Sequence, residues 1–390
     1  MGAWLLVAAG GGGDAIAAVM VARMLGVGER RLHVATYSWD RLMVDPVPGP
    51  RGREWFTGLR PVGGRNFQVT AGSAVRAPAG SLLPRLAVEL PATLYLLDAS
   101  EGAGGLGAQL QELVATLRAD RVLIVDGGGD ILATGHEAGL RSPLGDSLVL
   151  AAAAGLDCEV QVLVAGLGLD GELPEDVLLQ RCARLGAAVA GRLSAEDARE
   201  YQPLFGWHPS EATGLLCVAA LGARGRVEIR GAGLPVRLTD HSSEVYRLEH
   251  RAVMSANQVA QAVVGTRSLA EAEAATTAAT GVSEIEEERR KAAGMVRRSG
   301  GRTLDLLAVL DRLSRHAAGA ANRGIDYLTL RRIGEVLGLT ADELPHLGDR
   351  LRHGRSTPYF PPLWPVGEAQ RPQAAELPSG VVSRRVRGSR

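Results

Sequence analysis

The sequence predicts an α/β protein with a mainly parallel, Rossmann-like sheet, helices on both faces of that sheet, and a helical C-terminal region. Strand-like apolar runs alternate with helical stretches along the first half of the chain, which is typical of a parallel sheet covered by helices. With 390 residues and 46% hydrophobic content, the chain can bury one large core or two moderate ones. Glycine clusters directly follow two of the apolar runs, and such clusters are typical of binding sites at strand ends.

The elements of the first half are expected in a regular order. Helices are predicted over 15–25, 106–118, 145–155 and 175–189, and strands over 3–9, 32–37, 93–98, 121–126 and 159–165. The segment 45–90 interrupts the alternation because it is rich in proline and glycine. We interpret this segment as a long excursion near the site.

The second half begins with two predicted helices, 195–205 and 210–222. Three short strands follow near 226–230, 235–239 and 244–248. They are expected to form either a small antiparallel addition or an edge of the main sheet.

The rest of the chain is predicted to be helical over 268–292 and 303–352, with Ser283 and Glu286 forming a capping box at a helix start. We therefore expect three parts. These are an α/β ligand-binding domain over 1–265, a helical region over 266–362 and a disordered tail over 363–390.

The composition excludes several function classes. Positive and negative side chains are equal in number, 43 each, so no overall field attracts the chain to nucleic acid or an anionic membrane. Lys291 is the single lysine, which excludes a Schiff-base lysine from the N-terminal half and a Walker-type phosphate loop. Glycines interrupt the first apolar run, so we expect a first strand rather than a signal peptide, no membrane partner and a cytoplasmic location.

The first glycine cluster, Gly10 to Gly13, is followed by Asp14. Because glycine has no Cβ, the backbone there can approach a ligand within hydrogen-bond distance. We predict that the amides of Gly11, Gly12 and Gly13 hold a phosphate or carboxylate while Asp14 accepts a hydrogen bond from a ligand hydroxyl. The alternative is that Asp14 only caps the helix that follows.

The second cluster places three glycines between Asp126 and Asp130, so both carboxylates can reach the same small volume. Paired carboxylates suit sugar hydroxyls, a divalent cation or general acid–base catalysis. His136, beside Glu137, is the histidine of the polar loop that follows, and the alternative for it is a surface position. The predicted catalytic residues are Asp126, Asp130 and His136.

Loops that follow different parallel strands meet at one edge of the sheet, so their polar residues are expected to share one pocket. Within these loops, Arg141 and Ser142 form the strongest candidate anion clamp because arginine offers a planar fork. Trp39 has core packing as its alternative role. The predicted substrate-binding residues are Gly11, Gly12, Gly13, Asp14, Trp39, Arg41, Asp98, Gly127, Gly128, Gly129, Glu137, Arg141, Ser142, Gly168 and Asp170.

Five motifs of the chain together resemble an archaeal and actinobacterial family known as a domain of unknown function (DUF1152-like), over about residues 3–250. The motifs are Gly10–Asp14, Trp39–Arg51, Asp126–Ala133, Gly139–Leu144 and Gly166–Leu173. This resemblance implies no particular activity. More loosely, the chain is similar to polysaccharide pyruvyl transferases, which carry comparable glycine turns, although it lacks the asparagine usual in the first of those motifs.

The leading hypothesis is a transferase or hydrolase that binds a phosphorylated or nucleotide-linked small molecule. The pattern allows a nucleotide and a divalent cation as cofactors, and it assigns neither the metal nor the oligomeric state. The alternatives are a ligand-sensing or regulatory protein and a subunit of a biosynthetic complex. Residues 325–340 have the rhythm of a helix-turn-helix with Arg331 and Arg332 available for phosphates, but two helices that close a domain give the same pattern. A small molecule, rather than nucleic acid, is therefore the expected partner.

Overall fold

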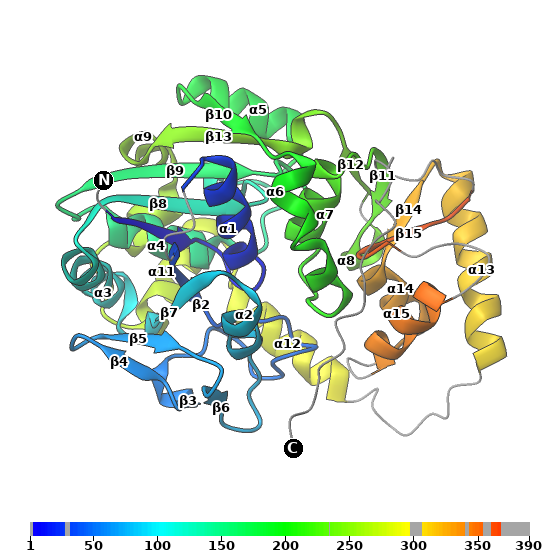
Figure 1. Ribbon diagram of the computed structural model, residues 1–390, viewed down its shortest axis with the longest axis horizontal. Coiled ribbons are helices and arrows are strands. Elements are labelled where there is room, and N and C mark those ends of the chain that lie inside the picture. The colour runs from blue at the N-terminus through cyan, green and yellow to red at the C-terminus, as the bar shows by residue number, and fades with distance from the viewer. Residues whose placement is uncertain are drawn as a thin grey trace, which may run out of the picture.

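A computed structural model describes residues 3–27, 32–233, 235–296, 306–339, 343–353 and 360–367. The chain forms a large α/β body and a smaller lobe that contains the C-terminal helices (Figure 1). The predicted α/β class is confirmed, together with the largely parallel centre of its sheet and the helical C-terminal region. Residues 368–390 of the predicted tail lie outside the described residues. No described helix combines the length and apolar character needed to cross a membrane.

The main sheet has nine strands in the order β10-β13-β9-β8-β1-β2-β7-β5-β4. Its central strands are all parallel: β9 (Glu159–Ala165), β8 (Ala119–Gly127), β1 (Ala3–Ala8), β2 (Leu32–Tyr37) and β7 (Ala92–Leu97). Strand order changes direction at β1, because β2 lies on one side of it and β8 on the other. Such a switch point leaves a crevice at the carboxyl ends of the strands, which is where ligands bind in open α/β sheets.

Antiparallel strands flank the parallel centre on both sides. They are β13 (Glu244–Glu249) and β10 (Ala188–Arg192) next to β9, and β5 (Asn66–Val69) and β4 (Arg60–Val62) next to β7. The segment 45–90 supplies β4 and β5, a two-stranded pair of β3 (Phe56–Thr57) with β6 (Ala74–Val75), and the short helices η1 (Arg53–Trp55) and α2 (Leu83–Glu89). The predicted excursion therefore extends the sheet edge.

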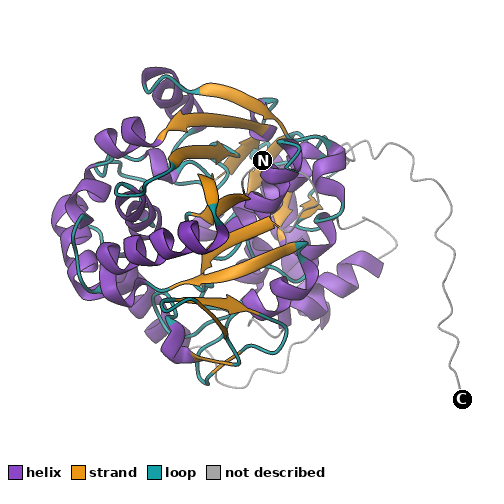
Figure 2. Cartoon of the chain, turned by 60° about the vertical axis from the view of Figure 1, so that its left-hand side comes forward, coloured by secondary structure: helices purple, strands orange, loops and turns teal. Residues whose placement is uncertain are grey.

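Side chains that alternate along the central strands feed two separate cores. Leu6 and Ala8 of β1 face one core, and Leu5 and Val7 face the other, as the two-residue period of a strand requires. Figure 2 shows the strands running between helices on either side. The first core is covered by α1 (Asp14–Met24), α2, α6 (Ala195–Arg199) and α7 (Glu211–Ala220), and the second by α3 (Gly102–Leu117), α4 (Pro143–Ala153), α5 (Glu175–Arg184), α9 (His250–Ala256), α10 (Gln258–Val263), α11 (Leu269–Thr280) and the start of α12 (Glu284–Val296).

Several predicted helices differ from the structure. The stretch predicted over 268–292 is divided into α11 and α12, and the one predicted over 303–352 contains the strand β14 (Tyr327–Thr329). The helix predicted over 175–189 ends at Arg184, because Gly186 adopts a φ of +72° and turns the chain into β10. The helix predicted over 195–205 is divided into α6 and the 3₁₀ helix η4 (Gln202–Gly206). Ser283 accepts a hydrogen bond from the Glu286 backbone N–H at 3.1 Å, which is the first half of the predicted capping box.

The three short strands of the second half divide between the two expected arrangements. β13 enters the main sheet, whereas β11 (Gly225–Glu228) and β12 (Pro235–Leu238) form an antiparallel pair in a second sheet. That sheet continues with β14 (Tyr327–Thr329) and β15 (Leu363–Pro365). Around it lie α8 (Arg230–Gly233), α13 (Leu306–Asn322), α14 (Leu330–Leu337) and α15 (Glu343–His353), on the right of Figure 1.

Glu228, at the end of β11, joins this second sheet to the C-terminal helices. Its side chain is 1% exposed and accepts hydrogen bonds from Arg323 at 2.6 Å and Arg332 at 2.7 Å. His316 Nε2 lies 3.0 Å from the same carboxylate. Burial raises the pKa of Glu228, but the bonds from Arg332, Arg323 and His316 outweigh it, so the pKa lies below its usual value. The carboxylate is therefore charged and links three side chains that are distant in sequence.

We predict that Glu228→Gln lowers the free energy of unfolding by about 1–3 kcal/mol, because it replaces one of the two shared acceptor oxygens by a donor and removes the buried negative charge that faces Arg332. Urea denaturation followed by circular dichroism measures the change. Glu335→Gln is the matched control, since Glu335 also pairs with Arg332 but is 40% exposed, and we expect it to cost less than about 1 kcal/mol. Equal losses in the two variants would contradict the central role of Glu228.

Candidate functional site

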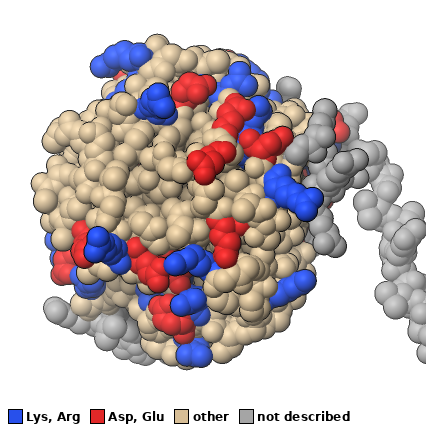
Figure 3. Space-filling model, turned by 90° about the vertical axis from the view of Figure 1, so that its left-hand side faces the viewer, with Lys and Arg blue, Asp and Glu red and all other residues tan. Residues whose placement is uncertain are grey.

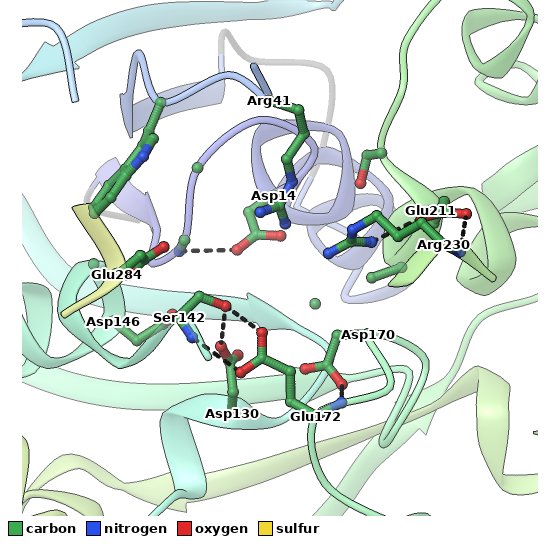
Figure 4. Close-up of a pocket in the computed structure, with 17 residues that line it drawn as sticks. Asp14, Arg41, Asp130, Ser142, Asp146, Asp170, Glu172, Glu211, Arg230 and Glu284 are labelled. Carbon is green, nitrogen blue, oxygen red and sulfur yellow. Dashed lines mark hydrogen bonds and ion pairs between the residues drawn. The ribbon is translucent and has the colours of Figure 1, made fainter. Parts of the chain in front are cut away.

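A pocket opens at the carboxyl ends of β1 and β8, at the switch point of the main sheet (Figure 4). Its lining comes from the first glycine turn, from the loops after β2, β8 and β9, and from the starts of α4, α7, α8 and α12. The lining residues are Gly10, Gly11, Asp14, Trp39, Arg41, Gly127, Asp130, Ser142, Gly145, Asp146, Asp170, Glu172, Ser210, Glu211, Ala212, Arg230 and Glu284.

Asp14 begins α1 and points into the pocket, where its Oδ2 accepts a hydrogen bond from the Gly10 N–H at 2.9 Å. The surrounding glycines make room for this carboxylate. A Cβ on Gly10 would stand 2.7 Å from Asp14 Oδ2, and one on Gly127 would stand 3.0 Å from Oδ1. Burial raises the pKa of Asp14 to about 7, against the lowering effects of the Gly10 N–H and the Arg41 charge. Gly10 and Gly127 therefore leave the space that the Asp14 carboxylate occupies.

Asp126 and Asp146 lie next to Asp14. One carboxylate oxygen from each of the three aspartates falls within 4.8 Å of the other two. Asp126 is held at the end of β8 by the Gly129 N–H at 3.0 Å, and Asp146 lies in the first turn of α4. Burial, followed by repulsion from neighbouring carboxylates, raises the pKa of Asp126 and of Asp146 well above the usual range.

Glu172 organises the opposite wall. It accepts hydrogen bonds from the backbone N–H groups of Arg141 at 2.6 Å and Ser142 at 3.0 Å, and from the Ser142 hydroxyl. The same hydroxyl lies 3.5 Å from Asp130 Oδ2. Asp170 Oδ1 accepts the Glu172 N–H at 2.8 Å. Ser142 therefore lies between Asp130 and Glu172, and the hydrogen bonds that its backbone N–H and hydroxyl donate to Glu172 fix its position.

Burial also raises the pKa values of Asp130 and Asp170, the two aspartates of this wall. The pKa of Asp170 rises to about 7 through burial and the Glu172 charge. Burial and then the Asp126 charge raise the pKa of Asp130 well above its usual value. Proton exchange near neutral pH is therefore available at Asp170, and Asp130 is suited to carry a proton.

Arginine side chains form the remaining wall. Figure 4 shows Arg41 and Arg230 facing the acidic group of Asp130, Asp170 and Glu172 across the pocket. Glu211 orients Arg230 from behind, because its carboxylate accepts hydrogen bonds from the Arg230 Nη1 at 2.8 Å and backbone N–H at 3.2 Å. The pocket therefore has walls of opposite charge.

The structure brings together half of the predicted site residues. Gly11, Asp14, Trp39, Arg41, Gly127, Asp130, Ser142 and Asp170 line the pocket, and Asp126 is buried beside it. Trp39 also belongs to the second core, so it has the packing role that was its alternative, and its Nε1 donates to Glu288 on α12 at 3.2 Å.

Other predicted residues lie outside the pocket lining. His136 is near the surface, with Nε2 2.8 Å from Gln258 Oε1. Glu137 closes its own loop by accepting from the backbone N–H groups of Thr134 at 2.8 Å and Gly135 at 3.0 Å, and it pairs with Arg181. These contacts give Glu137 a structural role.

The remaining predicted residues are also accounted for by local geometry. Asp98 caps a turn by accepting from Ser100 and Arg53, and it lines a separate hollow beside β5 and α3. Arg141 contributes its backbone N–H to Glu172, while the residue as a whole is exposed. The predicted glycines absent from the lining are Gly12, Gly13, Gly128, Gly129 and Gly168.

Several lining residues were not in the predicted set. Glu172 stands in the loop after β9, and Asp146 lies in the first turn of the helix that follows the loop after β8, so the rule that placed Asp130 could have found them. Glu211, Arg230 and Glu284 come from the second half of the chain. Their spacing in the sequence gives no signal, because only the packing of α7, α8 and α12 brings them to the pocket.

Comparison with known protein families gives a match over most of the chain. The chain matches, over residues 5–292, the family model described as "Protein of unknown function (DUF1152)". No curated protein and no solved structure matched it in the corresponding searches.

We predict that Gly10→Ala lowers the free energy of unfolding by about 1–3 kcal/mol, because the added methyl would overlap Asp14 Oδ2 and force that carboxylate to move. Urea denaturation gives the measurement. The matched control is Gly155→Ala, since a Cβ there would meet no atom within 4 Å, and it should leave stability unchanged or slightly raised. An unaffected Gly10→Ala protein would show that the packing around Asp14 is loose.

The Glu137 loop should give a defined pH dependence. Burial raises the Glu137 pKa, but hydrogen bonds from Thr134 and Arg181 outweigh it and set the pKa at about 2. A lowered carboxyl pKa stabilises the fold at pH values above the unfolded pKa, and that contribution is lost as the pH falls toward 2. We therefore expect Glu137→Gln to be less stable than the parent at pH 6, and the difference to shrink as pH falls from 5 to 3. A difference that stays constant in urea titrations over this range would refute the assignment.

Proposed function

The chain belongs to the DUF1152 family, and we propose that it is an enzyme that binds a phosphorylated or nucleotide-linked small molecule and catalyses group transfer or hydrolysis. The observation that supports this proposal best is the bipolar pocket. Arg41 and Arg230 face Asp130 and Asp170 across one cavity at the sheet's switch point, where α/β folds bind ligands.

The arginine wall suits an anionic group of the substrate. A guanidinium offers several N–H donors in a planar fork that matches phosphate or carboxylate oxygens. Arg230 is fixed by Glu211, so little side-chain freedom is lost when an anion binds. Arg41 is exposed and stands at the pocket lining, which suits a role in capturing the anion.

The acidic wall suits the hydroxyl-bearing part of the substrate and the proton transfer. Ser142 and Glu172 are already fixed by hydrogen bonds to each other, which gives the preorganised geometry that catalysis requires. Asp130 lies beside Ser142 and would exchange a proton with an attacking water or a substrate hydroxyl. Group transfer is also the reaction class that the looser resemblance to pyruvyl transferases implies.

A ligand sensor is the second candidate, because the C-terminal lobe contacts the pocket wall directly. Glu211 accepts a hydrogen bond from the Thr329 hydroxyl and lies 3.4 Å from the Arg331 guanidinium. An anion bound at Arg230 would therefore act on the same carboxylate that holds β14 and α14. Product formation separates the two candidates, since a sensor binds its ligand without converting it.

Nucleic-acid binding by the helices near 325–340 is not part of the proposal. Arg331 is turned inward toward Glu211, and Arg332 is engaged by Glu228 and Glu335. Figure 3 draws the side of the molecule that is on the left of Figure 1, away from these helices, and there too positive and negative side chains are interspersed rather than gathered in a positive patch. Phosphate-backbone binding needs free cations in such a patch.

We predict that nucleotides or sugar phosphates raise the midpoint of thermal unfolding, as a ligand present at 100 times its Kd adds about 2.7 kcal/mol to stability. The panel is run with and without Mg²⁺. Active compounds are then incubated with the protein and followed by ³¹P NMR for turnover. Arg230→Gln should abolish the shift, whereas Arg237→Gln, an exposed change of the same charge on β12, should retain it. A panel without any shift would overturn the proposed ligand class.

A further inference from the structure

We propose that Asp14, Asp126 and Asp146 form a binding site for one divalent cation of the Mg²⁺ or Mn²⁺ class. One oxygen of each carboxylate lies within 4.8 Å of the other two. The three side chains come from the start of α1, the end of β8 and the first turn of α4. These elements are fixed by the two cores, so the oxygens converge without any ligand to gather them.

An unpaired oxygen supports this assignment independently. Asp146 is 4% exposed, and its Oδ1 is buried without a hydrogen-bond partner among the described residues. A buried carboxylate oxygen without a partner is costly. Asp146 lines the pocket beside Asp14, so a cation held between the two carboxylates would supply the missing interaction.

The charge around the three aspartates also calls for a cation. Asp130, Asp170, Glu172 and Glu284 add further carboxylates to the same pocket. Arg41 and Arg230 are the lining cations among the described residues, and Arg230 is shared with Glu211. Carboxylates taken out of water remain ionised only when cations compensate them.

The donor set selects a hard cation. All three donors are carboxylate oxygens, which favour Mg²⁺, Mn²⁺ or Ca²⁺ over metals that prefer thiolate or imidazole. Mg²⁺ is usually bound through a small number of carboxylates and completes its shell with waters and substrate phosphates. A site of three carboxylates that opens into a pocket suits this mode.

The role of the cation rests on the proposed function. Arg41 stands on the opposite side of Asp14 from Asp130 in Figure 4. A substrate phosphate placed between the cation and the arginines would be neutralised from both sides. The cation would then explain how an anionic substrate enters a pocket lined mainly by acids. Binding of the cation itself depends only on the three aspartates.

The test measures Mn²⁺ binding to the full-length protein, first stripped with EDTA and dialysed, by the loss of the free Mn²⁺ signal in electron paramagnetic resonance. No phosphorylated compound is present. We expect saturable binding near one ion per chain, competition by Mg²⁺, and at least a tenfold weaker Kd in Asp146→Asn. Asp126→Asn serves as a second variant, and Asp157→Asn, a surface change of the same charge, should bind like the parent. Circular dichroism confirms that each variant is folded.

Each outcome has one meaning. Absence of saturable Mn²⁺ binding at millimolar concentration overturns the cation site, and so does equal affinity in the parent and both folded site variants. Mn²⁺ binding without any response to the phosphorylated panel supports the cation site and overturns the proposed function alone. If EDTA-treated protein responds to the panel but binds no Mn²⁺, the proposed function is supported and the cation site alone is overturned.

Discussion

Burial of several carboxylates at one end of the sheet is the constraint on which the site depends. Asp14, Asp126, Asp130 and Asp146 are packed at one end of the sheet, where burial raises the pKa of each and neighbouring carboxylates raise those of Asp126, Asp130 and Asp146 further. Such a group is unfavourable by itself, and the fold holds it in place with two hydrophobic cores and the turns after β1 and β8. Burying these carboxylates together therefore lowers the stability of the fold at the place where the chemistry is expected, as in many functional sites.

Buried carboxylates also join the C-terminal lobe to the α/β body, and there their pKa values shift in the opposite direction. Glu211 and Glu228 are buried carboxylates, but arginines surround them and their pKa values are lowered. Glu211 contacts Arg230 at the pocket and Arg331 on α14, while Glu228 gathers three side chains of the C-terminal helices. Paired acids therefore hold the C-terminal lobe on the body, and the unpaired oxygen of Asp146 marks the candidate site.

The parallel centre of the sheet and the floor of the pocket could be predicted from the sequence. Alternating apolar runs determine the strands, and the convergence of strand ends puts Asp14 and Asp130 in one pocket. The antiparallel β10 could not be predicted, because its alanine-rich segment also fits the end of a helix. The neighbours of His136 in the sequence predict that it lies in the site, but the loop after β8 places it at the surface beside Gln258. Arg230, Glu211 and Glu284 depend on packing between distant helices, which a local pattern does not encode.

The position of α12 has a consequence for how the chain can be divided. Glu288 accepts hydrogen bonds from Trp39 and from the Gly49 N–H, and Glu284 accepts one from the Leu144 N–H. The border expected near residue 265 therefore separates the floor of the cavity from part of its rim. A fragment ending there would retain every strand of the main sheet yet leave the indole of Trp39 and the start of α4 without the carboxylates that contact them. The smallest piece with an intact cavity must extend through Glu288.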